Sequence, residues 1–320
     1  MTLQDWVDES RERIDEHGLV EGSIEAGKAF WTGAFCRFGE HVWNYGDTIF
    51  EHGEWDVLLV LDTCRPDVLE EVAADYDYLP ADVPTRTSAA SASIEWVDKN
   101  LRNDEYAAEL AETAYVTGNL FSENIADGTL LMNDEVWQYG WSNDVYTTPP
   151  EVLADRAIDV HREHDPERMI VHFMQPHAPY RALIDRYPDW FNPPNPEDDD
   201  DPSHPAWQLW ENLRHGVISH EEVWEAYRDN LRWVLDDGVD LILENVDADR
   251  VAITADHAEA FGEWGLYAHP PYAPAPVLKN VPWVVTSAED TGSYEPTVEA
   301  ETPDVEEDEL NERLRALGYK

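Results

Sequence analysis

One stretch constrains the fold more than any other, the run "WDVLLVLD" at residues 55–62. Five aliphatic residues stand in a row between two acids, with no polar residue among them to face water. A strand that is apolar on both faces is buried on both faces, which is typical of a parallel sheet. Such a sheet needs helices packed on each side of it. The run therefore predicts a chain of the α/β class.

Further strands and helices alternate along the chain. Strands are expected at 114–119, 168–176, 250–255 and 281–287. Helices are expected at 93–101 and 220–246, where apolar residues recur at helical spacing. Alternation of this kind over most of the length is typical of crossover connections between parallel strands. We therefore predict a three-layer α/β/α sandwich with a largely parallel central sheet.

Acids and imidazoles follow several of these strands, namely Asp62, His177 and the adjacent Asp256 and His257. Ligands of open α/β sheets bind beyond the carboxyl ends of the strands, so these side chains are expected to share one site. Carboxylate oxygen and imidazole nitrogen suit a divalent cation such as Zn²⁺ or Mn²⁺. An Asp-His pair taken alone is more often a solvated pair in an ordinary loop. The position of all these residues at strand ends favours a shared cation site over a solvated pair.

The net charge is extreme, because 69 Asp and Glu oppose 21 Lys and Arg, which leaves −48. The acids are spread along the chain, as on the surface of a protein from an extreme halophile, where salt screens the repulsion. The alternative, an acidic protein that binds a basic partner, predicts concentrated blocks, and only 197–201 and 298–309 qualify. Nucleic acid is excluded as a partner, since no basic stripe is present to displace its counterions.

Cysteine content and hydropathy place the chain among intracellular proteins. Two cysteines, Cys36 and Cys64, offer neither a disulfide framework nor a thiolate metal cluster. The first 18 residues are polar and acidic, unlike a signal peptide. The longest purely aliphatic run, "VLLVL", is far too short to span a bilayer. We expect a soluble, cytoplasmic protein without a transmembrane segment.

Four ordered segments resemble those of a known family: "DVLLVLDTCRPDVL" (56–69), "FMQPHAPY" (173–180), "YRDNLRWVLD" (227–236) and "ITADHAEAFGEWGLYAHP" (253–270). Together they resemble the sulfatase-like branch of the alkaline phosphatase superfamily, here of haloarchaeal type. There an early strand ends in a metal-binding Asp, and a late strand ends in Asp-His-Gly-Glu, followed by Gly-Glu and a further His. The closing "RLRALGY" (313–319) also resembles a common tail of these proteins.

The resemblance implies an alkaline phosphatase-like fold and three parts of the chain. These are a helical N-terminal extension (1–52), a catalytic domain (53–290), and an acidic linker with a short C-terminal helix (291–320). Within the extension, helices are expected at 3–17 and 23–38. The Pro- and Asp-rich stretch at 192–205 is expected to be a mobile surface loop.

The resemblance also implies divalent cations, either Zn, Mn, Ca or Mg. Asp62, Asp256 and His257 are expected to hold one of them. His269 is expected to bind a second cation, with a substrate contact as the alternative. His177 is expected to act as general acid on the leaving group or to bind the second cation, with a structural histidine in a loop as the alternative. His172, in the middle of a strand, is expected to be a satisfied core residue.

The nucleophile is expected in "TSAASASIEW" (87–96), where a helix begins and its dipole favours an oxyanion. Ser91 matches the family spacing and Ser93 is the better N-cap, so both stay candidates, and one of them is expected to be only a helix cap. Arg65 is expected to clamp the anionic group of the substrate, and a salt bridge within its own turn is the alternative.

One departure from the family decides the expected chemistry. Sulfatases require Cys or Ser in a C/S-x-P-S-R context, where the residue is oxidised to formylglycine, and neither serine has the Pro and Arg. We therefore predict a metal-dependent, sulfatase-like hydrolase that cleaves a small phosphate or sulfate ester, with phosphate favoured. One alternative is a transferase that moves a phosphoalcohol group onto a glycan or lipid headgroup. The other is an inactive family member that serves as a binding module.

Overall fold

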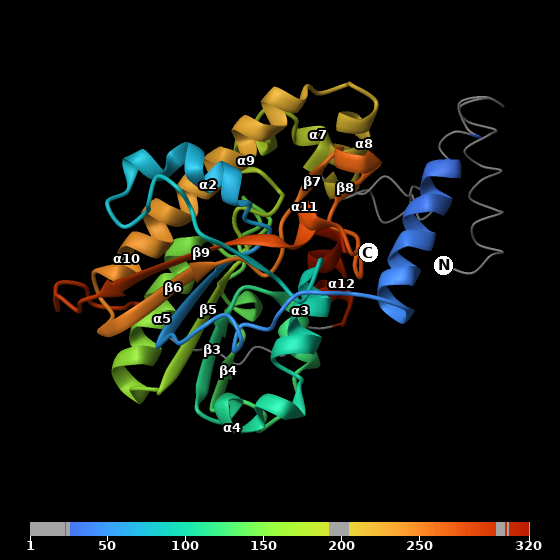
Figure 1. The fold of residues 1–320 in the computed structure, drawn as a ribbon. Helices are drawn as coiled ribbons and strands as arrows, with labels where there is room; N and C mark the ends of the chain where they lie inside the picture. The colour runs from blue at the N-terminus through green and yellow to red at the C-terminus, as the bar shows by residue number, and fades with distance from the viewer. Residues whose placement is uncertain (1–22, 24–25, 192–204, 299–304, 306, 320) are drawn as a thin grey trace.

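The computed structural model describes residues 23, 26–191, 205–298, 305 and 307–319. Its centre is a seven-stranded sheet with the order β2-β9-β6-β1-β5-β3-β4 (Figure 1). In chain order these strands are β1 (Val57–Leu61), β2 (Thr85–Thr87), β3 (Thr113–Thr117), β4 (Met132–Asp134), β5 (Arg168–Phe173), β6 (Ala248–Thr254) and β9 (Asn280–Ala288). A separate two-stranded ribbon pairs β7 (Ala260–Phe261) with β8 (Tyr267–Ala268).

Most neighbouring strands of the sheet are parallel. β1 lies in the centre and pairs in parallel with β5 and β6, and β3 pairs in parallel with β5 and β4. β9 is antiparallel to both of its neighbours, β6 and β2. The predicted largely parallel sheet is therefore confirmed, and the strand expected at 281–287 is present but runs opposite to the rest.

Alternate residues of β1 enter two different cores. Val57, Leu59 and Leu61 pack in one hydrophobic cluster, whereas Leu58 and Val60 pack in another. The first cluster contains residues of α2 (Pro66–Val72), α5 (Pro150–His164), α9 (His220–Val234) and α10 (Asp240–Leu243). The second contains residues of α3 (Ser93–Asn100) and α4 (Ala107–Leu110). Helices thus cover both faces of the sheet, and the predicted three-layer α/β/α sandwich is confirmed.

The long helix expected at 220–246 is interrupted. A π-helical turn over Leu235–Val239 separates α9 from α10. Gly238 lies in this turn and contacts the sheet, since a Cβ atom there would lie 2.8 Å from Cε1 of Phe173 in β5. The absence of a side chain at this position lets the helix approach the strand closely.

Shorter helices lie between these elements. They are α6 (Arg181–Ile184), α7 (Pro188–Phe191), α8 (Pro205–Arg214) and α11 (Pro276–Lys279). The helix α12 (Glu307–Ala316) is present where a short C-terminal helix was expected. Most of the loop expected at 192–205 lies outside the described residues. None of the helices in the described ranges is long and apolar enough to cross a membrane.

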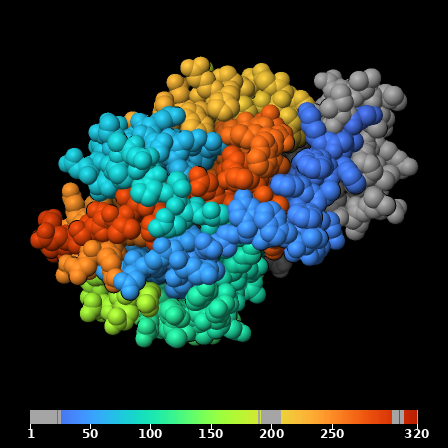
Figure 2. Space-filling model, in the orientation of Figure 1, coloured from blue at the N-terminus to red at the C-terminus, as the bar shows by residue number. Residues whose placement is uncertain are grey.

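The N-terminal extension is described in part. The helix expected at 3–17 lies outside the described residues, and a helix over 26–41 is present where one was expected at 23–38. Figure 2 shows the following segment (blue) crossing one face of the molecule. Along that segment, Ile49 packs into the second core beside Trp55. The division of the chain into three parts stays a prediction.

The parallel strands bring polar residues to one edge of the sheet. β1, β3, β5 and β6 all end at this edge, because parallel neighbours have their carboxyl ends on the same side. Asp62 follows β1, Asn119 follows β3, His177 follows β5, and Asp256 follows β6. The fold therefore gathers these four side chains from distant parts of the chain.

Candidate active site

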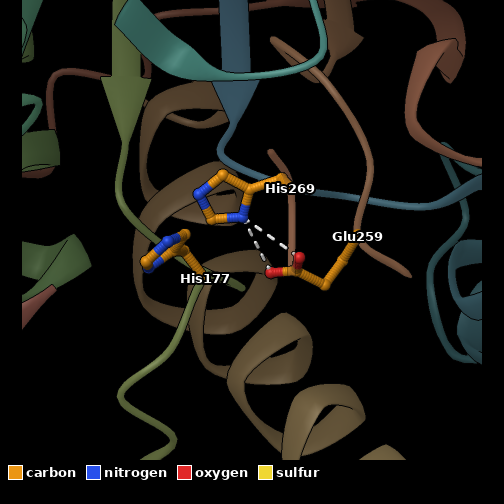
Figure 3. A group of neighbouring side chains, drawn as sticks. All are labelled: His177, Glu259 and His269. Carbon is orange, nitrogen blue, oxygen red and sulfur yellow. Dashed lines mark hydrogen bonds and ion pairs between the residues drawn. The ribbon is translucent and has the colours of Figure 1, made fainter. Parts of the chain in front are cut away.

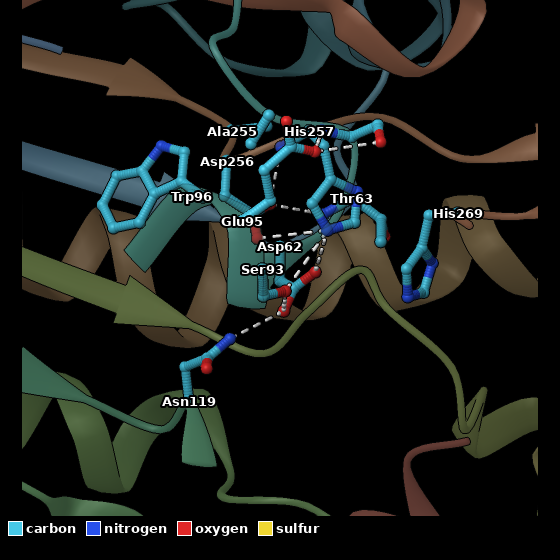
Figure 4. A network of polar contacts seen from close by, with 12 residues as sticks. Asp62, Thr63, Ser93, Glu95, Trp96, Asn119, Ala255, Asp256, His257 and His269 are labelled. Atoms are coloured by element: carbon cyan, nitrogen blue, oxygen red, sulfur yellow. Dashed lines mark hydrogen bonds and ion pairs between the residues drawn. The ribbon is translucent and has the colours of Figure 1, made fainter. Parts of the chain in front are cut away.

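Ser93 lies at the centre of a buried polar cluster at this edge (Figure 4). Its Oγ atom is 3.2 Å from Oδ2 of Asp62 and 3.2 Å from Nε2 of His257. Ser93 is the first residue of α3, and the preceding Ala92 has extended backbone angles. The serine hydroxyl therefore lies beside two of the three predicted ligands, at the N-terminal end of a helix whose amides favour negative charge.

The carboxylate of Asp256 is held by two backbone groups. Oδ1 accepts hydrogen bonds from the N–H of His257 at 2.8 Å and from the N–H of Thr63 at 3.1 Å. Thr63 has a φ of 66°, in the left-handed region that a β-branched residue rarely adopts. Backbone strain of this kind clusters at functional sites. Here the positive φ of Thr63 turns the chain after β1, so that the N–H of Thr63 reaches Asp256 at the end of β6.

Several atoms of the cluster are buried without a hydrogen-bond partner in the described structure: Oδ1 of Asp62, Oδ2 of Asp256 and Nε2 of His172. Asp62, Asp256 and His172 form a group whose ligand atoms could hold a metal ion. Nε2 of His257 is 3.2 Å from Oδ2 of Asp256 and 3.7 Å from Oδ1 of Asp62, which places it at the same position. Unpartnered buried oxygens are costly, and a cation would satisfy them. The residues fit a divalent cation.

The electrostatics of the cluster agree with this fit. Burial, with Asp256 and Glu259 nearby, raises the pKa of Asp62 well above its usual range. Burial also disfavours the charge of Asp256, but His257 and His172 hold the pKa of that carboxyl below its usual value. Two carboxyl groups so close together in a buried place cannot both be ionised easily without positive charge between them.

The histidine His257 presents the form that a metal ligand needs. Its Nδ1 is 3.0 Å from the carbonyl oxygen of Ala258, so Nδ1 carries the proton and donates it. Burial lowers the pKa of this imidazole to about 4, which keeps it neutral at pH 7. Nε2 therefore points a lone pair at Asp62, Asp256 and Ser93. A hydrogen bond at the far nitrogen is the usual way in which a ligating histidine is oriented.

A second group lies next to the first and consists of His177, Glu259 and His269 (Figure 3). Nδ1 of His269 is 3.0 Å and 3.2 Å from the two carboxylate oxygens of Glu259. The ring of His269 is 4.9 Å from that of His177 and 4.7 Å from that of His257, centroid to centroid. These three side chains could hold a second cation. The two candidate cation groups are therefore adjacent, with the rings of His257 and His269 side by side where the groups border each other.

Burial and charge again set the protonation of these residues. Burial, reinforced by His269, lowers the pKa of His177 well below its usual value. Burial acts against the charge of His269 too, but Glu259 raises the pKa of that imidazole above its usual value. Neutral His177 can ligate a cation directly, whereas His269 must first release the proton that Glu259 stabilises.

The helix α9 holds two loops that carry candidate ligands, the loop after β1 with Asp62 and the loop after β5 with His177. The hydroxyl of Tyr227 donates to the carbonyl oxygen of Thr63 at 2.6 Å and accepts the N–H of Arg65 at 3.0 Å. The side-chain amide of Asn230 donates to the carbonyl oxygens of His177 and Pro179 at 3.2 Å and 3.0 Å. One helical turn of α9 thus positions the loop after β1 and the loop after β5.

Ser91 and Arg65 make contacts outside the serine cluster. Oγ of Ser91 donates to the carbonyl oxygen of Pro270 at 3.0 Å and accepts the N–H of Ala273 at 2.9 Å. Arg65 uses its guanidinium on Asp67, on the carboxylate of Glu263 and on the backbone oxygen of Glu259. For Arg65 these contacts favour the salt-bridge alternative over a free clamp for substrate.

Three residues of the site were not predicted as such. Asn119 donates to Oδ2 of Asp62 at 3.3 Å, and its position after a strand was the available clue. Glu259 was part of the late motif but had no assigned role. The prediction that His172 is a satisfied core residue is wrong for one nitrogen. Nδ1 lies 2.8 Å from the hydroxyl of Tyr115, whereas Nε2 finds no hydrogen-bond partner among the described residues and lies 3.7 Å from Asp256.

The arrangement is that of an α/β sandwich whose parallel strands carry a candidate metal and nucleophile site at their carboxyl edge. No protein-family model matches the chain, and no curated protein matches it. Among solved structures it is similar to the soluble domain of lipooligosaccharide phosphoethanolamine transferase A from Neisseria meningitidis, with 16% identity and a TM-score of 0.46, over 73% of this chain and 76% of that one.

It is also similar to the integral membrane protein lipooligosaccharide phosphoethanolamine transferase A from the same organism. Here the identity is 15% and the TM-score 0.48, over 91% of this chain and 59% of that one. The chain thus spans less than two thirds of that protein. At these identities and TM-scores, neither likeness assigns an activity to this chain.

Proposed function

We propose that this chain is a metal-dependent enzyme of the alkaline phosphatase superfamily that acts on phosphoesters through a covalent intermediate on Ser93. The observation that carries the proposal is the position of Oγ of Ser93, 3.2 Å from both Asp62 and His257. Beside it lie buried carboxylate oxygens to which no residue in the described part of the chain donates a hydrogen bond. A nucleophilic hydroxyl next to a cation site and a helix N-terminus is the arrangement that phosphoryl transfer needs.

The first step forms a bond between Oγ of Ser93 and phosphorus while the bond from phosphorus to the departing alcohol oxygen breaks. The electron pair leaves with that oxygen, and the serine proton ends on the departing alcohol. In the second step an acceptor hydroxyl bonds to phosphorus, the bond to Ser93 breaks, and the acceptor proton returns to the serine. A divalent cation bound by Asp62, Asp256 and His257 would polarise the phosphoryl oxygen and lower the pKa of the serine hydroxyl.

The second half of the reaction separates hydrolysis from transfer. Ser93, Asp62 and His257 are fully buried, so bulk water has restricted access to the intermediate. An alcohol acceptor, such as a glycan or lipid headgroup, is the second candidate function beside hydrolysis, and burial does not choose between them, because it hinders a larger acceptor at least as much as water. The two similar structures named above are phosphoethanolamine transferases. Their names carry no argument for this chain, and the glycerol experiment below decides between the two acceptors.

The test uses the full chain loaded with Zn²⁺ or Mn²⁺ and bis-p-nitrophenyl phosphate as substrate. We expect a burst of about one p-nitrophenolate per protein, with a p-nitrophenylphosphoryl adduct on Ser93 in the mass spectrum. Added glycerol should yield glyceryl p-nitrophenyl phosphate if the acceptor site takes alcohols, and only p-nitrophenyl phosphate if water is the acceptor. A protein that binds metal but shows neither burst nor turnover would be the inactive family member.

A further inference from the structure

Tyr319 is a further partner of Ser93. Its hydroxyl oxygen lies 3.2 Å from Oγ of Ser93. Its ring is stacked on that of His177, with 5.5 Å between centroids and 22° between planes, and lies 5.8 Å from the ring of His269. On another side it meets Phe121 edge-on at 4.7 Å. The phenol therefore lies between the serine and the second candidate cation group.

The helix α12 fixes the position of this tyrosine. Leu314 and Leu317 are buried in a hydrophobic cluster with Trp137 and two other residues. After them, Gly318 has a φ of 83°, and its N–H donates to the carbonyl oxygen of Arg315 at 2.9 Å. The N–H of Tyr319 donates to the carbonyl oxygen of Leu314 at 2.9 Å. These two bonds are a Schellman C-cap, in which only glycine adopts the left-handed conformation easily.

A count of protons shows which oxygen donates in the contact between Tyr319 and Ser93. The hydroxyl of Ser93 has a single proton, and with a cation bound Asp62 would be ionised, so its Oδ2 accepts that proton at 3.2 Å. Nε2 of His257 has no proton to give, because the proton of that ring lies on Nδ1 and faces the oxygen of Ala258. The serine therefore donates into the cluster, and the contact with Tyr319 is satisfied only if the phenol donates to Oγ of Ser93.

We propose that Tyr319 is a catalytic residue of the reaction proposed for Ser93, and that its hydroxyl stabilises negative charge on the serine oxygen. This inference rests on that proposed function. Negative charge develops on Oγ of Ser93 when the serine loses its proton in the first step, and again when the serine is the leaving group in the second. A fixed donor aimed at that atom stabilises both transition states without reorganisation. The phenol keeps its proton throughout, so the balance of the two steps is unchanged.

The experiment compares Tyr319→Phe with the wild-type chain, both loaded with Zn²⁺, and follows the p-nitrophenolate burst from bis-p-nitrophenyl phosphate. The variant keeps the ring and its stacking and loses only the hydroxyl. We expect the burst rate to fall about 10- to 100-fold and the adduct on Ser93 to persist correspondingly longer, with KM, metal content and melting temperature unchanged. Tyr294→Phe is the matched control, since it removes a phenol that donates to Asp155 on α5 at 2.7 Å, and its burst should match the wild type.

The outcomes separate the two proposals. If the wild type shows the burst and Tyr319→Phe shows it at the same rate, Ser93 stands as the nucleophile and the role of Tyr319 is wrong. A faster burst in Tyr319→Phe or Tyr319→Ala would mean that the tyrosine covers the serine rather than assisting it, which also overturns the inference. A wild type without burst or adduct removes the proposed function of Ser93, and the role of Tyr319 with it.

Discussion

The backbone N–H of Thr63 donates to Oδ1 of Asp256 at 3.1 Å, although 193 positions separate the two residues in the sequence. This bond joins the turn after β1 to the end of β6, the two neighbouring strands that carry the predicted ligands. It forms because Thr63 adopts a φ of 66°. The geometry of the candidate cation site therefore depends on one strained turn as well as on the ligands themselves.

This relationship predicts opposite results for two substitutions of Thr63. Proline cannot adopt a positive φ and has no N–H to donate, so Thr63→Pro should lower the free energy of unfolding by about 3 kcal/mol or more and weaken metal binding. Glycine keeps the N–H and suits the backbone conformation, so Thr63→Gly should stay within ~1 kcal/mol of the wild type. Urea unfolding and metal titration measure both effects. Equal metal affinity in the two variants would contradict the role of the turn.

The two groups of ligands predict two cations. Asp256→Ala removes a ligand of the first group and His177→Ala a ligand of the second, so each should lower the metal content by about one equivalent while the far-ultraviolet circular dichroism is retained. Arg86→Ala, on the exposed strand β2, serves as a control and should keep the full content. Elemental analysis after exhaustive dialysis gives the stoichiometry. Full metal content in Asp256→Ala would show that the first assignment is wrong.

The contacts of the two serines predict different defects. Ser93→Ala should abolish the covalent adduct and lower the rate by several orders of magnitude, because it removes the nucleophile. Ser91→Ala should retain the adduct but lower the free energy of unfolding by about 1–3 kcal/mol, since it removes the hydrogen bonds that the serine hydroxyl makes with the N–H of Ala273 and the carbonyl oxygen of Pro270. Intact-protein mass spectrometry and thermal unfolding separate the two. Unchanged turnover in both variants would instead indicate water as the nucleophile.

Much of the fold could be predicted because the buried strands are continuous apolar runs. The run before Asp62 and the run before Asp256 each end at an acid, and parallel strands bring such ends together. The direction of β9 could not be predicted in this way, since an apolar run has the same pattern whether it pairs in parallel or antiparallel. The π-helical turn could not be predicted from the sequence either, because it depends on how closely Gly238 approaches Phe173.

The parts of the site that were not predicted depend on tertiary contacts. Which of Ser91 and Ser93 faces the carboxylates depends on the residue at which α3 begins, and helix ends are uncertain by a residue or two from sequence. His172 lies within a strand, where only its neighbours decide whether both ring nitrogens are satisfied. Tyr319 reaches Ser93 because α12 packs on Trp137, a contact between distant parts of the chain.

Lys279 predicts a pH dependence of stability. Its ammonium group is buried and donates to Asn44 and to the carbonyl oxygen of Ala89, at 2.6 Å and 2.8 Å. Burial lowers the pKa of this lysine to about 8, against an ordinary value of 10.5. Between these two pH values the unfolded chain holds a proton that the folded chain lacks, so stability rises with pH across the window.

The measurement compares the wild type with Lys279→Met, in which this group no longer titrates. From pH 8 to about 10, the free energy of unfolding of the wild type should increase relative to that of the variant, as followed by urea unfolding at constant ionic strength. Below pH 7 the difference between the two proteins should be constant. A difference that stays constant up to pH 10 would show that the lysine has an ordinary pKa.

The net charge of −48 predicts a strong dependence on salt. At low ionic strength the repulsion among the acids opposes the compact state, and ion pairs such as Arg250 with Asp56 and Arg162 with Asp290 offset only part of it. Near 1 M salt the Debye length falls to about 3 Å, which screens this repulsion. The melting temperature should therefore rise steadily from about 0.1 to 2 M KCl, with loss of structure in dilute buffer. A melting temperature that is flat or falls over this range would contradict adaptation to high salt.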